Sequence, residues 1–348
     1  MKYIALILLF LLIFTSKAYA QLFPPCFPWC YTPNPFITPT VTPTLVISPS
    51  PTITPTETIT PTPSSSPSGI IKGAYVGDGI ENLTNVDAFE SLTGKNLDVI
   101  LVYQAWEGDW KNFRTQWITN AYANGSVPMI TWEPWNYTMG VNQAKYRLSR
   151  IAAGNHDTFI RNYAIAAKAT GKDFYLRPMH EMNGNWYPWA ESANGNKSGD
   201  YIKAWKRIVD IFRQEGATNV KFVWCPNAVY TGSTSLTQLF PGDNYIDYLC
   251  MDGYNWGDTN GGWQSFTTVF QNTYNQLSAL SNKPIIVGET ASAEIGGPKP
   301  NWITDTYKVA ITSMPKIMMI NWFNANKEKD WRVNSTQASL NAFKEVIK

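Results

Sequence analysis

The sequence predicts an α/β fold for residues 69–348, a closed (β/α)8 TIM barrel. Two observations support this fold class. Short, almost continuous apolar runs recur eight times, which is typical of parallel strands buried on both faces. Amphipathic helical patterns separate the runs, and the region has the usual size of such a barrel. A doubly wound open sheet is the second candidate, but no glycine-rich phosphate loop follows the first predicted strand.

The predicted strands are taken from the apolar runs in chain order. They are Ile70–Val76, Leu97–Tyr103, Val127–Trp132, Phe174–Pro178, Val220–Trp224, Tyr248–Met251, Pro284–Gly288 and Ile317–Trp322. The clearest helix lies after the fourth run, where the segment 201–212 places apolar side chains on one face. Asp200 stands just before this helix as a candidate N-cap.

Three further segments precede the barrel. Residues 1–20 join a basic start to the apolar run Ile4–Phe14 and end in Ala18-Tyr19-Ala20, which predicts a cleaved signal peptide and a secreted, extracellular protein. The apolar run is too short to span a bilayer, so we expect no membrane contact beyond the cleaved signal. Residues 21–36 form a short patch with aromatic residues and cysteines. Residues 37–68 are rich in Thr, Pro and Ser, which predicts a disordered linker that as an extended stalk could hold the barrel at a cell surface.

The composition limits the classes of partner. With 28 basic and 26 acidic residues the net charge is +2, and no basic stripe is visible, so nucleic acid is not expected as a partner. Fifteen Trp and eighteen Tyr exceed what a core needs and suit stacking on a neutral polysaccharide. With only two histidines, His156 and His180, we predict neither a metal site nor another cofactor. A monomer is expected. Cys225 and Cys250 fall on neighbouring predicted strands, where they either form a disulfide or remain buried free thiols.

Two glutamates follow predicted strands and would meet at the carboxyl end of the barrel, where active sites of this fold lie. Glu181 follows the fourth strand, and Glu289 follows the seventh. Two such carboxyls can flank one glycosidic bond, with one as acid and the other as nucleophile. The bland alternatives are a solvated loop acid for Glu181 and a helix-capping acid for Glu289.

The two carboxyls need different surroundings for this chemistry. Apolar walls would keep the acid protonated, and Trp186 and Tyr187 stand close to Glu181 in the sequence. Hydrogen bonds and a nearby cation would keep Glu289 ionised. Tyr254 and Arg332 are the candidates for these two roles.

At these residues the chain resembles glycoside hydrolase family 26. The segment Arg177–Trp189 (RPMHEMNGNWYPW) resembles the acid/base signature of that family, and Ile285–Thr290 (IIVGET) resembles its nucleophile strand. The family groups β-mannanases, some mixed-linkage β-glucanases and β-1,3-xylanases among retaining (β/α)8 glycosidases. The resemblance covers the whole region after the linker. It implies an endo-β-glycanase acting on β-1,4-linked plant cell-wall polysaccharide, either β-mannan or mixed-linkage β-1,3-1,4-glucan.

Carried over by position, the resemblance implies Glu181 as acid/base and Glu289 as nucleophile. It also implies that a set of neighbours shapes the same sugar-binding site, namely His180, Trp186, Tyr254, Trp331 and Arg332. Four more tryptophans near strand ends are candidate substrate-binding residues: Trp106, Trp132, Trp256 and Trp322. For Trp106, Trp256 and Trp322, core packing is the alternative.

Glu133 departs from the family pattern. Mannan-specific members carry a histidine after the third strand, and that histidine helps to recognise the axial 2-hydroxyl of mannose. Glu133 in that place makes an equatorial glucosyl unit an alternative to mannose. The other interpretation is that Glu133 is buried and paired with Arg177.

Other functions also stay open. They are a β-1,3-xylanase within the same family, a non-catalytic carbohydrate-binding barrel held by the stalk, and a functional role for residues 21–36.

Overall fold

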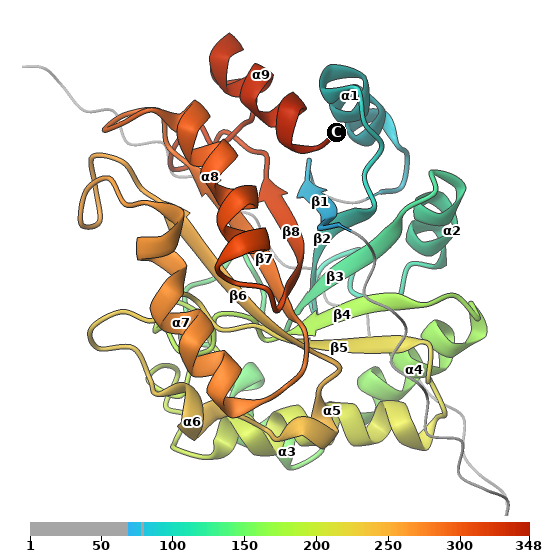
Figure 1. Cartoon of the computed structure of the whole chain (residues 1–348). Helices are drawn as coiled ribbons and strands as arrows, with labels where there is room; N and C mark the ends of the chain where they lie inside the picture. Colours follow the sequence, from blue (N-terminus) through green and yellow to red (C-terminus); the bar gives the residue numbers. More distant parts are fainter. Residues whose placement is uncertain (1–68, 78–79) are drawn as a thin grey trace, which may run out of the picture. The chain divides into compact units, whose positions relative to one another are not determined.

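The computed structural model describes residues 69–77 and 80–348, so the predicted signal peptide, patch and linker lie outside the described residues. Eight parallel strands form a closed barrel in which each strand pairs with its sequence neighbours and β1 also pairs with β8 (Figure 1). The barrel prediction is therefore confirmed, and the open sheet is excluded. The strands are β1 Ile71–Tyr75, β2 Val99–Ala105, β3 Val127–Glu133, β4 Phe174–Pro178, β5 Val220–Trp224, β6 Tyr248–Asn255, β7 Ile285–Ser292 and β8 Ile317–Phe323.

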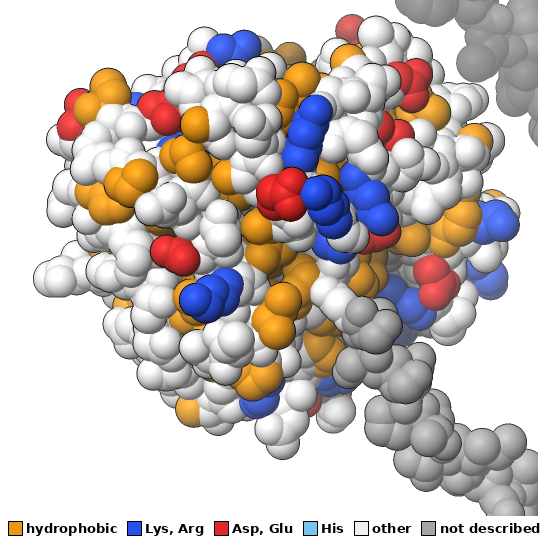
Figure 2. Space-filling model, turned by 45° about the horizontal axis from the view of Figure 1, so that its top comes forward, with side chains coloured by type: hydrophobic (Ala, Val, Ile, Leu, Met, Phe, Trp, Pro, Cys, Tyr) orange, Lys and Arg blue, Asp and Glu red, His pale blue; other side chains and the backbone are white. Residues whose placement is uncertain are grey.

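Helices connect the strands and surround the barrel (Figure 1). Within the described residues they are α1 Thr84–Thr93, α2 Thr115–Ala123, α3 Leu148–Ala152, α4 Asp157–Ala169, α5 Asp200–Gln214, α6 Leu236–Leu239, α7 Phe266–Leu280, α8 Lys299–Thr312 and α9 Gln337–Val346, with 3-10 turns η1 Ala144–Tyr146 and η2 Asp243–Tyr245. Among these helices, none has both the length and the apolar character needed to cross a bilayer. On the face shown in Figure 2, basic and acidic side chains are scattered among hydrophobic ones.

Helix α5 shows how the sequence pattern produces the outer layer. Its buried side chains recur every three or four residues and form the face that packs inward: Tyr201, Ala204, Trp205, Ile208, Val209, Ile211 and Phe212. The helix already includes Asp200, so the N-cap prediction for Asp200 is wrong. Gly199 is the N-cap, with a φ of 81°, and Asp200 Oδ2 instead accepts a hydrogen bond from the backbone N–H of Lys197.

Strands β6 and β7 continue further than their apolar runs predict. The added segments Asp252–Asn255 and Glu289–Ser292 pair with each other residue by residue. These segments are polar, so they carry no apolar signal, yet Asp252 is fully buried and Glu289 is 5% exposed. Asp252, Tyr254 and Glu289 are therefore held by strands rather than by loops.

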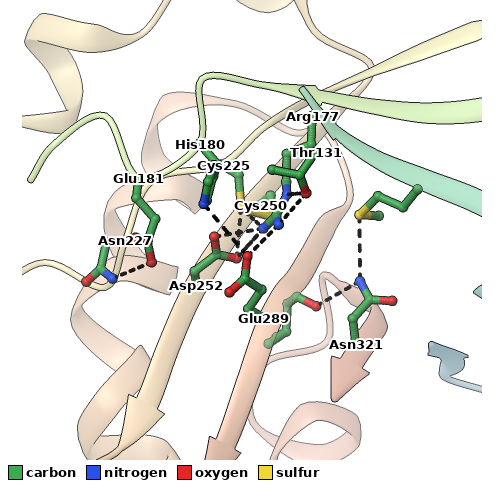
Figure 3. Close-up of a disulfide and its surroundings, with 12 residues drawn as sticks. Thr131, Arg177, His180, Glu181, Cys225, Asn227, Cys250, Asp252, Glu289 and Asn321 are labelled. Carbon is green, nitrogen blue, oxygen red and sulfur yellow. Dashed lines mark hydrogen bonds and ion pairs between the residues drawn. A yellow bond between two sulfur atoms is a disulfide. The ribbon is translucent and has the colours of Figure 1, made fainter. Parts of the chain in front are cut away.

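A disulfide joins Cys225, directly after β5, to Cys250 in β6 (Figure 3). Backbone pairing between β5 and β6 covers only Val223 with Tyr248 and Trp224 with Leu249. The disulfide adds a covalent link where this pairing ends. Of the two alternatives for Cys225 and Cys250, the structure shows the disulfide and not buried free thiols.

Candidate active site

A cavity of about 1070 Å³ opens where the strands end, and both predicted catalytic glutamates line it. Its walls combine carboxyl, amide and aromatic side chains from the ends of strands and from the loops that follow them. Such a mixture of aromatic surface and few polar groups is typical of a ligand-binding site.

Glu181 reaches the cavity from a strained turn after β4. Met179 and Glu181 have φ values of 49° and 52°, in the left-handed region that non-glycine residues seldom adopt. The backbone N–H of Met179 donates to the carbonyl of Trp132 (3.1 Å), and that of Glu181 donates to the carbonyl of Cys225 (2.7 Å). The turn is thus tied to the strand ends on both sides, which is how such strain is maintained at functional sites.

The Glu181 carboxyl is buried and accepts two hydrogen bonds. Asn227 Nδ2 donates to Oε1 and Trp186 Nε1 donates to Oε2, both at 2.8 Å (Figure 3 shows the first). Burial and the negative charge of Glu289 raise the pKa of Glu181 to about 7, although the two hydrogen bonds act in the opposite direction. Glu181 is consequently protonated in mildly acidic solution.

The Glu289 carboxylate contacts a buried cation and a hydroxyl. Arg177 Nη2 donates to Oε1 (2.5 Å), and the Tyr254 hydroxyl donates to Oε2 (2.6 Å). Burial alone would raise the pKa of Glu289, but the charge of Arg177, supported by the hydrogen bond from Tyr254, lowers it to about 2. Glu289 is therefore ionised under the same conditions in which Glu181 is protonated.

Arg177 organises the floor of the site beneath Glu289. Its fully buried guanidinium also donates to both oxygens of Asp252, at 2.9 and 2.7 Å, and to Thr131 Oγ1 at 3.0 and 2.6 Å (Figure 3). Every one of these contacts is buried, so the geometry of the guanidinium is fixed on several sides. The Cys225–Cys250 disulfide lies against it, with Arg177 Nη1 3.7 Å from Cys225 Sγ.

The cation near the nucleophile is Arg177, and the prediction of Arg332 is wrong. Arg332 is directed to Asp330, its neighbour in the loop after β8, at 2.8 Å (Nε–Oδ1) and 2.7 Å (Nη2–Oδ2). Its side chain is 43% exposed and is absent from the lining of the cavity. Arg177 belongs to the acid/base motif, but it also lies inside a predicted strand. The motif alone therefore did not identify Arg177 as the cation beside Glu289.

Glu133 lies at the cavity wall with 6% of its surface exposed. Trp135 Nε1 donates to its Oε2 at 3.2 Å, and burial raises the pKa of Glu133 to about 8. Arg177 directs its donors to Thr131, Asp252 and Glu289 instead. The alternative pairing of Glu133 with Arg177 is thus wrong.

The other predicted substrate-binding residues divide into two groups. Trp186, Tyr254, Trp256 and Trp331 line the cavity together with Glu133. His180 is buried behind the lining, with Nε2 3.9 Å from Glu289 Oε1, and burial followed by the charge of Arg177 lowers its pKa to about 3.

Three predicted tryptophans do not reach this cavity. Trp132 and Trp322 have no exposed surface, and Trp322 Nε1 donates to the carbonyl of Trp331 (2.8 Å). Trp106 is 3% exposed and borders a separate cavity of about 200 Å³. For Trp132 and Trp322 core packing prevails, because both belong to strands, whose side chains alternate between the two faces of the sheet.

Five residues of the site were missed by sequence reasoning or given no role there. Tyr103 and Tyr230 line the cavity, Asn227 contacts Glu181, and Arg177 and Asp252 form the floor. The Tyr103 hydroxyl is buried near Glu289, and burial together with the charge of Glu289 raises the pKa of Tyr103 well above its usual range. Four of them lie in or just after the last residues of a strand or its pairing, a position shared by many residues without a role, and Tyr230 lies further along the loop after β5.

Two groups of side chains could in principle hold a metal ion. His180, Asp252 and Glu289 offer ligand atoms within 4.8 Å of one another, as do Cys225, Cys250 and Asp252. In the first group the Arg177 guanidinium already pairs with both carboxylates, and in the second both sulfurs belong to the disulfide. The carboxylate and sulfur atoms of both groups therefore already have partners inside the protein.

Comparison with known proteins agrees with this geometry. Residues 128–306 match the model of glycosyl hydrolase family 26. Endoglucanase H of Acetivibrio thermocellus is 44% identical over 286 residues, which cover 80% of this chain but only 30% of that protein. A mannan endo-1,4-beta-mannosidase of Bacillus subtilis is 30% identical over 210 residues, or 54% of this chain and 50% of that protein.

Solved structures show the same fold. The Cellulomonas fimi endo-beta-1,4-mannanase double mutant superposes with a TM-score of 0.61 at 18% identity, covering 80% of this chain and 70% of that chain. At this identity the likeness concerns the fold alone. The family model and the long match to endoglucanase H go further than the fold. The chain belongs to glycosyl hydrolase family 26.

Proposed function

We propose that this family 26 endo-β-glycanase is a retaining enzyme in which Glu181 is the acid/base and Glu289 is the nucleophile. The observation that carries this proposal is the contrast between two carboxyls that line one cavity: a guanidinium and a phenol contact Glu289, and an amide and an indole contact Glu181. Burial and the charge of Glu289 raise the pKa of Glu181 to about 7, while Arg177 outweighs burial and lowers that of Glu289 to about 2. Two carboxyls in such contrasting surroundings are suited to the acid and nucleophile roles of double displacement.

In the first step the Glu289 carboxylate attacks the anomeric carbon, and the bond from that carbon to the leaving sugar oxygen breaks. Glu181 gives its proton to that oxygen. The resulting ester removes the negative charge of Glu289, which had helped to raise the pKa of Glu181. The pKa of Glu181 therefore falls after the step, and the carboxylate left by the proton transfer can act as a base.

In the second step Glu181 takes a proton from water while the water oxygen attacks the anomeric carbon. The ester bond breaks, Glu289 leaves as a carboxylate, and the product has the β configuration of the substrate. Arg177 and Tyr254 hold the two oxygens of Glu289 throughout. They compensate the charge that returns to this carboxylate.

We further propose a glucose-based substrate, mixed-linkage β-1,3-1,4-glucan. Glu133 supports this choice, because it presents a buried carboxyl where mannan-specific members present a histidine. The 44% identity with endoglucanase H also favours a glucan, while the mannosidase relatives keep β-mannan as the second candidate. The sequence of residues 1–20 supports secretion, so the polymer would be met outside the cell.

Reducing-end release from mixed-linkage β-glucan, galactomannan, cellulose and β-1,3-xylan tests both parts. We expect the highest kcat/KM on the mixed-linkage glucan. Glu289→Ala should lower kcat at least about 1000-fold, because the covalent step is lost, and azide should restore turnover as a β-glycosyl azide. Glu345→Ala, at an exposed residue of α9 that pairs with Lys348, is the control and should match the wild type.

The outcomes separate the two parts. Preference for galactomannan would overturn the glucan assignment and leave the mechanism intact. Wild-type turnover by Glu289→Ala would overturn the mechanism. Tight binding of oligosaccharides without new reducing ends would favour a non-catalytic barrel.

A further inference from the structure

Lys299 is a buried cation that the chemistry described above does not use. It is the first residue of α8 and has no exposed surface. Its Nζ donates three hydrogen bonds, to the carbonyls of Asp330 (3.0 Å) and Arg332 (2.8 Å) and to Ser335 Oγ (2.8 Å). All three acceptors belong to the loop between β8 and α9, so one ammonium group ties α8 to this loop.

The two carbonyls stand on either side of Trp331 in the chain. Trp331 lines the cavity, and its ring centroid lies 5.1 Å from those of both Tyr254 and Trp256. Tyr254 in turn donates its hydroxyl to Glu289. Direct contacts therefore lead from Lys299 through the backbone of the loop to the Trp331 ring, then to Tyr254 and the nucleophile.

Glu294 completes the attachment of this loop. Its Oε1 accepts hydrogen bonds from Ser335 (2.6 Å), Thr336 (3.1 Å) and Ser339 (2.7 Å), which fixes the chain where α9 begins. Ser335 thus contacts both Lys299 and Glu294.

The ammonium form of Lys299 is the one that can fill all three acceptors. Burial lowers the pKa of Lys299 to about 8, with Glu294 and Asp330 opposing this effect and Arg332 adding to it. In mildly acidic solution, where Glu181 is protonated, Lys299 therefore remains charged.

We propose that Lys299 is a positioning residue of the active site, which holds Trp331 against Tyr254 and so fixes the sugar-binding wall beside Glu289. The inference rests on the proposed function. It assigns to the start of α8 a role in catalysis that acts through the loop after β8 and involves no contact with substrate.

The test is a double-mutant cycle between Lys299→Met and Trp331→Ala. Each single change should lower kcat/KM at least about tenfold. The double variant should be no more than about threefold worse than Trp331→Ala alone, because both changes disturb the same contact.

Lys316→Met is the matched control. Lys316 is a partly buried lysine whose Nζ also donates three hydrogen bonds, to the carbonyls of Ser278 (3.2 Å) and Ser281 (3.1 Å) and to Asn282 Oδ1 (3.4 Å). It lies just before β8, at the opposite end of that strand from Trp331. Lys316→Met should lower the melting temperature but change kcat/KM by no more than about twofold. The fold-losses in kcat/KM of Lys316→Met and Trp331→Ala should multiply in the double variant.

The inference would be overturned if the fold-losses in kcat/KM of Lys299→Met and Trp331→Ala multiplied in the double variant. Unchanged kcat/KM in Lys299→Met would also overturn it. Should Lys299→Met fail to fold, Ser335→Ala replaces it in the cycle and the same criterion applies. If the wild type proves inactive, the proposed function fails, and the cycle is then measured on oligosaccharide affinity by calorimetry. Coupling in affinity would uphold the positioning role, and its absence would refute it.

Discussion

At the scale of single residues, the site depends on the different surroundings of two identical functional groups, the carboxyls of Glu181 and Glu289. Both carboxyls are buried, and burial alone would raise the pKa of each. Glu289 contacts a guanidinium and a phenol, whereas Glu181 contacts only an amide and an indole. A full positive charge outweighs desolvation, and neutral donors do not.

The amide contact of Glu181 leads to a prediction about pH dependence. Asn227 donates to the charged form of Glu181 and thus lowers its pKa, so Asn227→Ala should raise that pKa above about 7. Since a hydrogen bond to a charged group contributes about 1.5 kcal/mol, the shift should be roughly one unit. Glu181 must be protonated for the first step, so the alkaline limb of kcat/KM should move to higher pH by that amount.

A kcat/KM profile between about pH 4 and 9 measures the position of this limb. Asn341→Ala, on the exposed side of α9, should leave it in place. If the alkaline limb of kcat/KM kept its position or moved to lower pH in Asn227→Ala, the effect assigned to Asn227 on the pKa of Glu181 would be contradicted.

Sequence reasoning found both glutamates because each stands in a long motif beside a predicted strand. It named Arg332 as the cation near Glu289 and considered Arg177 only as a partner of Glu133. Only the folded chain shows that Arg177 has two carboxylates and a hydroxyl to satisfy it. Burial of a charge can be inferred from sequence only when its partners are known, and these lie 46, 75 and 112 residues away.

At the scale of secondary structure, the barrel could be predicted and the ends of two strands could not. Apolar runs located all eight strands, because the barrel core buries them on both faces. β6 and β7 continue through polar residues, which pair backbone to backbone although their side chains carry no apolar signal. The nucleophile is therefore placed by a rigid strand, which suits a group that must hold its geometry.

Gly288, directly before the nucleophile in β7, shows how closely this strand packs on the floor of the site. A Cβ atom there would lie 2.5 Å from both Asp252 Oδ1 and Cys250 Sγ, and 2.8 Å from Arg177 Nη1. Gly288→Ala should displace the Arg177–Asp252 pair. We expect kcat to fall at least about tenfold and the free energy of unfolding to fall by about 1–3 kcal/mol.

Steady-state kinetics and denaturant unfolding measure both effects. Gly140→Ala is the matched control, because a Cβ at Gly140 meets no atom within 4 Å. That variant should behave like the wild type. Full activity of Gly288→Ala would show that the floor tolerates movement and that Arg177 is not needed in its present place.

At the scale of the whole molecule, the closed barrel brings together two glutamates that are 108 residues apart in the chain. The loops after the strands then build a cavity of about 1070 Å³ around them, with aromatic walls. The chain spans 30% of the length of endoglucanase H. Which tryptophans face the cavity depends on strand register, and sequence alone could not decide it for Trp132 and Trp322.

Trapping the covalent intermediate tests directly whether Glu289 is the nucleophile and Glu181 the acid/base. A 2-deoxy-2-fluoro-β-cellobioside with a good leaving group should form the glycosyl ester quickly and hydrolyse slowly. Intact-mass spectrometry should then show one added fluorocellobiosyl group, and the labelled peptide should carry it on Glu289. A label on another residue, or none together with release of the α-anomer from mixed-linkage β-glucan, would contradict the roles given to Glu181 and Glu289.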